Sequence, residues 1–234
     1  MKITAVNILK RTCNFEKTYQ SVERQTNQMD NYGDLERPAD YAPPKNAADT
    51  LKTGLFIEIS TDGGVSGEYG FVESRAELLS IFEGLSACLI GRDPLDNRML
   101  WDMMSRFDRH SRSGIMMMAI SALDIALWDL KGKILGQPVY KLLGGGRPKV
   151  RPYISALGFS IEAEAAKKKA LEIRDMGIRA QKWFFRYGPS EGVAGMRKNL
   201  DMAFALREAL GEDYELMFDC YMGWNISYAR KMFY

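Results

Sequence analysis

The chain has 234 residues, of which 46% are apolar and 26% are charged, and its formal net charge is +2. This apolar content excludes a largely disordered protein, and the near-neutral charge excludes the basic footprint typical of a nucleic-acid-binding protein. The sequence has no apolar run near the ~20 residues of a membrane-spanning helix. Its three cysteines lack zinc or redox spacing and fit a reducing compartment. We therefore expect a cytoplasmic protein that binds neither nucleic acid nor membrane.

The first part of the chain, residues 1–147, predicts a mixed α and β domain. Residues 2–10 alternate as a strand does, and residues 54–72 predict a hairpin that turns at Asp62-Gly63. The intervening residues 14–49 are polar and irregular, and a loop of that length is often functional. Helices are expected at about 74–90, 94–108 and 114–135. The last of these has apolar residues at helical spacing that predict a buried face: Ile115, Met118, Ala119, Ala122, Ala126 and Leu130.

The second part, residues 148–234, alternates strands with helices. Strands are expected at 150–157, 178–185 and 214–219, and helices at 160–177, 190–211 and from 226 onward. This alternation indicates βαβ units and a parallel sheet. A complete eight-stranded α/β barrel uses about 31 residues for each of its units, so this part is long enough for about three. We expect the chain to be the front part of a longer polypeptide.

Two charged residues stand at the strand positions where such folds place their active sites, the carboxyl ends of parallel strands. Side chains alternate across a strand, so Lys182 is expected to point into the barrel, away from Trp183 and Phe185. Asp219 ends an apolar strand, where an unpaired carboxylate would be costly. The spacing leaves open whether the two residues line a site, form a structural ion pair, or Asp219 caps the helix at Asn225.

A long segment then provides a family resemblance. Residues 119–145, AISALDIALWDLKGKILGQPVYKLLGG, resemble the signature segment of the enolase superfamily, in its mandelate racemase and muconate lactonizing enzyme branch. The matching positions are Ala119, Asp124, Ala126, Asp129, Gly132-Lys133, Pro138 and Leu143-Gly144. Later segments, including AQKWFF and YELMFDCYM, resemble rhamnonate dehydratase-like acid-sugar dehydratases. The resemblance extends from about residue 54 onward and is weakest at 14–49.

The resemblance implies an α+β capping domain at 1–147, followed at 148–234 by the first part of a (β/α)7β barrel. It implies a hydro-lyase that converts a sugar acid to a 2-keto-3-deoxy sugar acid in carbohydrate acid catabolism. Such enzymes abstract the proton next to a carboxylate, and Mg2+ stabilises the resulting ene-diolate. The resemblance also implies a small-molecule sugar acid as partner and a homo-oligomer when the protein is full length, with this chain inactive alone.

Residue roles follow from the same resemblance. Asp219 is expected to be the first Mg2+ ligand, and Lys182 to be the catalytic lysine that contacts the substrate carboxylate. The second lysine of the family's Lys-x-Lys motif, a base in racemases, is replaced by Phe184. The remaining metal ligands and the histidine base would lie beyond Tyr234.

The sequence leaves open the roles of several residues outside these motifs. In the 14–49 loop, Arg37 and Tyr41 are expected to bind substrate, and Lys45 is a further candidate. His110, the only histidine, is expected to have a surface or capping role. Cys220 is expected to be a packing residue. Two alternatives to the dehydratase remain: a racemase or epimerase of the same superfamily, and a non-catalytic fragment or degenerate homologue.

Overall fold

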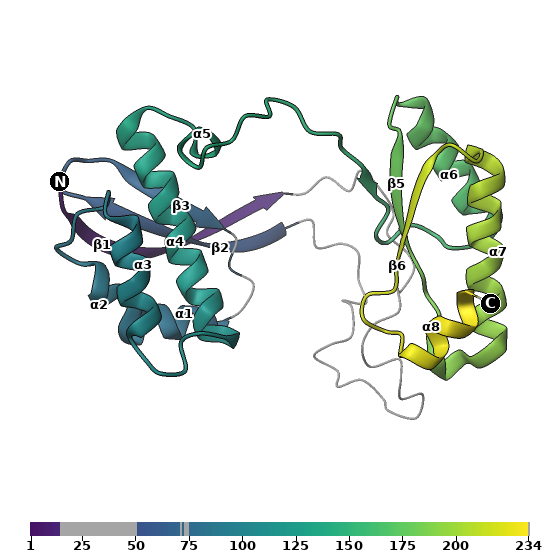
Figure 1. Cartoon of the computed structure of the whole chain (residues 1–234), viewed down its shortest axis with the longest axis horizontal. Helices are drawn as coiled ribbons and strands as arrows, with labels where there is room; N and C mark the ends of the chain where they lie inside the picture. The colour runs from purple at the N-terminus through teal and green to yellow at the C-terminus, as the bar shows by residue number, and fades with distance from the viewer. Residues whose placement is uncertain (15–50, 71, 73–74, 234) are drawn as a thin grey trace. The chain divides into compact units, whose positions relative to one another are not determined.

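The computed structural model describes residues 1–14, 51–70, 72 and 75–233 (Figure 1). These residues form two compact units, one ending at Pro148 and the other beginning at Lys149. None of the helices in the described part of the chain is long and apolar enough to cross a membrane.

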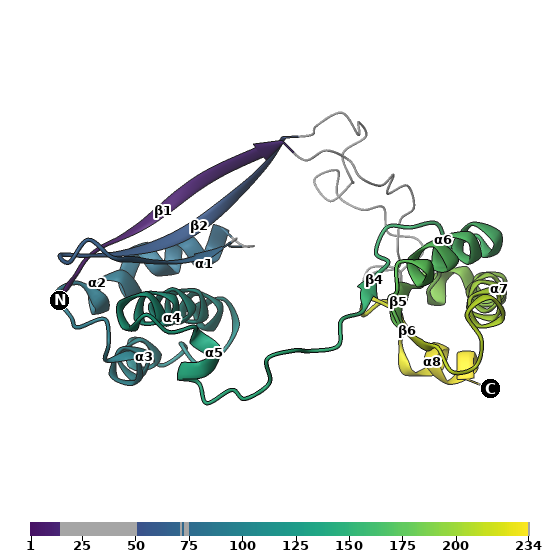
Figure 2. The same cartoon turned by 90° about the horizontal axis from the view of Figure 1, so that it is seen from above.

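The first unit is an antiparallel sheet covered by helices. Its strands lie in the order β1-β2-β3, and the β2–β3 hairpin confirms the one expected at 54–72. The strands are β1 (Ile3–Asn14), β2 (Leu51–Thr61) and β3 (Ser66–Gly70). The helices are α1 (Arg75–Ser80), the π-helical segment η3 (Ile81–Leu85), α2 (Ser86–Leu89), α3 (Asn97–Arg106), α4 (Gly114–Leu135) and α5 (Val139–Leu142). In Figure 2 the helices α1 and α4 lie along the sheet.

Helix α4 provides most of the core of this unit, although its buried face differs in part from the predicted one. Four predicted residues are buried as expected: Ala119, Ala122, Ala126 and Leu130. The prediction was wrong for Ile115 and Met118, which are each 41% exposed. At about 3.6 residues per turn, Met118 falls beside the buried stripe, whose centre runs through Leu123 and Leu130. Ile115 lies in the first turn, at the helix end.

A glycine allows α4 to approach β3 closely. Gly67 is buried, and a Cβ at this position would meet the backbone of Ala126 and Leu130 in α4. The same contact is fixed by polar groups, because the amide N–H of Glu68 donates to Asp129 Oδ2 at 2.8 Å. Helix α4 therefore packs directly on the backbone of β3. The close approach at Gly67 and the hydrogen bond from the Glu68 N–H fix its position.

Replacing a buried side-chain amide in α3 by an apolar group is expected to stabilise the protein. Asn97 is 4% exposed, and neither its Oδ1 nor its Nδ2 has a hydrogen-bond partner within the part of the chain that the structure describes. Replacement by leucine, which has the same number and branching of side-chain heavy atoms, removes two unsatisfied groups that each carry a desolvation cost. We expect Asn97→Leu to raise the free energy of unfolding by about 1–3 kcal/mol, measured by urea denaturation. The control is Asn7→Leu, because Asn7 is exposed and should gain nothing; a lower midpoint for Asn97→Leu would contradict this prediction.

The second unit is a parallel α/β layer, as the alternating pattern predicts. Its strands lie in the order β4-β5-β6 and pair in parallel. The elements are β4 (Ile154–Ser155), α6 (Ala163–Asp175), β5 (Ala180–Phe184), the 3-10 turn η4 (Pro189–Glu191), α7 (Gly192–Leu210), β6 (Glu215–Asp219) and α8 (Ile226–Phe233). The first strand is shorter than the expected 150–157. Gly177 and Gly211 adopt φ of 85° and 82° just after α6 and α7, which confirms both predicted helix stops.

Candidate functional site

The structure brings Lys182, in the middle of β5, together with Asp219, the last residue of the adjacent strand β6. In the β5–β6 register Lys182 stands opposite Met217, and Phe184 stands opposite Asp219. Lys182 Nζ lies 3.2 Å from Asp219 Oδ2, with the two side chains 24% and 33% exposed. The pair is therefore shielded on most sides but remains open to solvent.

The opposite face of β5 is a buried helix-packing face. Trp183 is fully buried and packs with Phe185 among apolar residues of α6 and α7. Trp183 Nε1 donates to Gln181 Oε1 at 2.9 Å, and Gln181 Nε2 donates to the Ala170 carbonyl of α6 at 2.9 Å. Strand alternation then places Lys182 on the other face, as the sequence predicts.

Two aromatic rings flank the Lys182 ammonium. Nζ lies 5.0 Å from the ring centroid of Phe184 and 5.5 Å from that of Tyr153, within the range of cation–π attraction. The hydrogen bond to Asp219 raises the pKa of Lys182, and Tyr153 adds to the increase, while burial acts in the opposite direction. Lys182 is thus a protonated donor, which fits the binding of a carboxylate better than the removal of a proton.

Sequence reasoning did not select Tyr153, although a signal was present. Ser155 pairs with Lys182 across the β4–β5 ladder, and residues two apart share a face of a strand. The predicted strand at 150–157 therefore placed Tyr153 on the Lys182 face. Charge was the signal used to select residues on the strands, so this neutral aromatic neighbour was missed.

Asp219 uses its two carboxylate oxygens differently. Oδ2 faces the ammonium, and Oδ1 accepts a hydrogen bond from the Tyr221 amide N–H at 2.8 Å. Tyr221 and Met222 follow with φ of 46° and 56°, a left-handed conformation that is uncommon outside glycine. The alternative in which Asp219 caps the next helix is wrong, because Asn225 Oδ1 itself accepts the Tyr228 N–H of α8 at 2.9 Å.

The chemistry of Asp219 fits one ligand of a hard divalent cation. Mg2+ prefers carboxylate oxygens, and Oδ2 already faces a positive charge at the open end of the sheet. Among the described residues no group of three or more His, Cys, Asp or Glu side chains is arranged to hold a metal ion. The described part of the chain therefore offers one such ligand at this position and not a complete site.

The other residues singled out from the sequence lie elsewhere. Arg37, Tyr41 and Lys45 lie outside the described residues. His110 is exposed in the first unit, where its Nε2 accepts a hydrogen bond from Arg109 Nε at 3.0 Å. Cys220 is half-buried and packs against the apolar core of the second unit, as expected.

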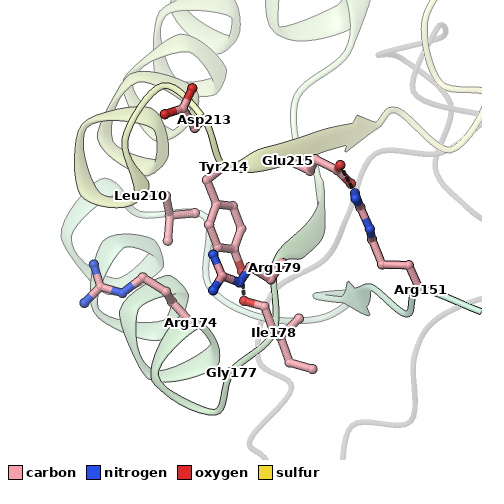
Figure 3. Close-up of a pocket in the computed structure, with 9 residues that line it drawn as sticks. All are labelled: Arg151, Arg174, Gly177, Ile178, Arg179, Leu210, Asp213, Tyr214 and Glu215. Carbon is pink, nitrogen blue, oxygen red and sulfur yellow. Dashed lines mark hydrogen bonds and ion pairs between the residues drawn. The ribbon is translucent and has the colours of Figure 1, made fainter.

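A cleft of about 730 Å³ opens at the amino ends of β5 and β6 (Figure 3). Its lining residues are Arg151, Arg174, Gly177, Ile178, Arg179, Leu210, Asp213, Tyr214 and Glu215. Figure 3 shows Arg151 paired with Glu215, and the Tyr214 hydroxyl donating to the Ile178 carbonyl at 2.7 Å. The cleft lies at the other end of the strands from Lys182 and Asp219 and includes neither residue. We therefore place the candidate site at the carboxyl ends.

Comparison with known proteins agrees with this architecture. Residues 35–144 match the family model "Mandelate racemase / muconate lactonizing enzyme, N-terminal domain". L-rhamnonate dehydratase from Gibberella zeae is 27% identical with a TM-score of 0.73, and the match covers 99% of this chain and 54% of that one. A putative dehydratase from Mesorhizobium loti is 28% identical with a TM-score of 0.66, covering 94% and 53%.

A racemase from Streptomyces coelicolor A3(2), whose structure contains bound magnesium, is 25% identical with a TM-score of 0.71. That match covers 98% of this chain and 58% of the racemase. The chain thus spans little more than half the length of the solved structures it matches. Within that span it has an α+β capping domain followed by the first part of a barrel, with about three βα units. Residues 35–144 therefore match the mandelate racemase and muconate lactonizing enzyme family, and nearly the whole chain is similar in fold to solved structures named as dehydratases and racemases.

Proposed function

We propose that the protein to which this chain contributes is a Mg2+-dependent dehydratase that converts acid sugars to 2-keto-3-deoxy acids. The observation that carries the proposal is the contact between Lys182 of β5 and Asp219 at the carboxyl end of β6, with Phe184 beside it. Similarity to an L-rhamnonate dehydratase over 99% of this chain supports the same reaction class.

Each residue of the pair has a separate role in this proposal. Lys182 is a protonated donor at the open end of the sheet, and it binds and orients the carboxylate of the sugar acid. Asp219 contributes one of the carboxylate ligands of Mg2+. When bound, Mg2+ stabilises the negative charge that develops on the substrate carboxylate as the α-proton leaves. We expect the remaining ligands to come from residues outside this chain.

Phe184 favours dehydration over racemisation. It lies next to Lys182 and is 4% exposed, and its side chain can neither accept nor donate a proton. Racemisation requires a proton acceptor on one face of the substrate and a donor on the other. Lys182 is a poor replacement because its hydrogen bond with Asp219 favours the ammonium form. Neither Phe184 nor Lys182 therefore supplies a second base.

A single base is sufficient for dehydration. It removes the α-proton and, as the resulting acid, returns that proton to the β-hydroxyl, which departs as water. The C–H and C–O bonds break, a C=C bond forms, and the enol product takes up a proton to give the 2-keto-3-deoxy acid. We expect that base to be a histidine outside this chain. Arg37 and Tyr41 stay predicted substrate contacts, and homo-oligomer assembly and cytoplasmic location stay predictions.

The test is incubation of the protein, extended to the length of its solved relatives, with Mg2+ and a panel of acid sugars in deuterated water. The expected product is a 2-keto-3-deoxy acid, detected by its reaction as an α-keto acid and by NMR. Inversion at C2 with deuterium incorporation and without loss of water would instead support the racemase or epimerase alternative. Absence of both reactions across the panel would support a non-catalytic homologue.

A further inference from the structure

The Lys182 ammonium already contacts the carboxylate of Asp219, which the proposed cation would also bind. Lys182 Nζ lies 3.2 Å from Asp219 Oδ2, while Asp219 Oδ1 accepts the Tyr221 N–H. Both oxygens therefore already have a hydrogen-bond donor. A divalent cation that binds Oδ2 meets a positive charge at the same atom, and the two charges repel each other.

The surroundings offer the ammonium a second position. In the position in which it contacts Asp219, Nζ also lies 5.0 and 5.5 Å from the rings of Phe184 and Tyr153. An ammonium displaced from Asp219 therefore keeps two aromatic faces within reach. Neither ring carries a negative charge, so neither competes with an incoming substrate carboxylate for the Lys182 ammonium. Tyr153 is 47% exposed, so this second position is accessible from solvent.

We propose that Lys182 and a divalent cation exchange places on Asp219. In the absence of the cation the ammonium holds the carboxylate, and when the cation binds, the ammonium moves to the pair of rings formed by Tyr153 and Phe184. There Lys182 is free to bind a substrate carboxylate, so the cation binds before the substrate. This inference rests on the proposed role of Asp219 as a metal ligand.

The exchange predicts that removing the lysine strengthens cation binding. We would titrate the length-extended protein with Mg2+ in a calorimeter, without substrate, and compare it with its Lys182→Met variant. The variant is expected to bind Mg2+ on the order of 3- to 10-fold more tightly, because a partly exposed ion pair and a nearby like charge are both removed. The matched control is Lys198→Met, which removes a lysine 5.4 Å from the Tyr187 ring and leaves Asp219 unchanged.

A second variant tests the ring pair. Tyr153→Ala removes an exposed ring, so the fold should be retained, and it should weaken Mg2+ binding because the ammonium loses part of its second position. In the Lys182→Met background the same change should have no effect, which a double-mutant cycle measures directly.

The outcomes separate this inference from the proposed function. Tighter Mg2+ binding by Lys182→Met, with Lys198→Met equal to the parent, supports the exchange. Equal or weaker binding by Lys182→Met shows that the lysine only supports Asp219, and it overturns the exchange while the proposed function stands. Failure of the parent and both lysine variants to bind Mg2+ overturns the proposed function and the exchange together.

Discussion

Gly67→Ala is expected to unfold the first unit or to destabilise it by about 3 kcal/mol, the upper part of the range for overpacked sites. A Cβ at residue 67 would clash with the carbonyl oxygen of Ala126 and lie 2.6 Å from the backbone nitrogen of Leu130. Both are backbone atoms of α4, so no side-chain rotation relieves the contact. Separating the helix from β3 would also break the Glu68 N–H to Asp129 hydrogen bond.

The measurement is chemical denaturation of the 234-residue chain, with Gly146→Ala as the matched control. Gly146 has no atom within 4 Å of the position that its Cβ would occupy, and its φ is not in the left-handed region. The control should therefore unfold at the midpoint of the parent. Equal stability of Gly67→Ala and Gly146→Ala would show that α4 does not rest on the backbone of β3.

Local patterns were sufficient to predict the parallel layer of the second unit. The repeated change from strand spacing to helix spacing located β5, α7 and β6, and glycine stops located the ends of α6 and α7. Strand alternation also placed Lys182 on the face opposite Trp183, because the side-chain period of a strand is fixed by its backbone. A family resemblance added Asp219, which the spacing alone could not distinguish from a helix cap.

Contacts between distant residues could not be predicted in the same way. The closeness of Gly67 to α4 depends on how two elements pack, and glycine at this position looks like any other strand glycine. The periodicity of α4 marks an apolar stripe but does not specify its edges, so Met118 was assigned to the core. The left-handed φ of Tyr221 and Met222 has no composition signal either, because neither residue favours that conformation.

Asp219→Asn is expected to abolish tight Mg2+ binding by the length-extended protein and to stop exchange of the substrate α-proton. Asparagine keeps the size of the side chain and an oxygen acceptor for the Tyr221 N–H, but it loses the negative charge that a hard cation requires. Loss of a residue that only supports a metal ligand costs about 10- to 100-fold in affinity. Loss of a ligand should therefore cost at least about 100-fold.

The fold should survive this substitution, which makes the result interpretable. The Lys182–Asp219 pair is partly exposed, and such a pair contributes at most about 1 kcal/mol to stability, so the denaturation midpoint should change little. The matched control is Asp213→Asn, in the cleft at the opposite ends of the strands (Figure 3). It removes the same charge from the same unit and should leave Mg2+ binding and proton exchange unchanged. If Asp219→Asn binds Mg2+ as tightly as Asp213→Asn does, Asp219 is not a metal ligand, and its contact with Lys182 is a structural ion pair.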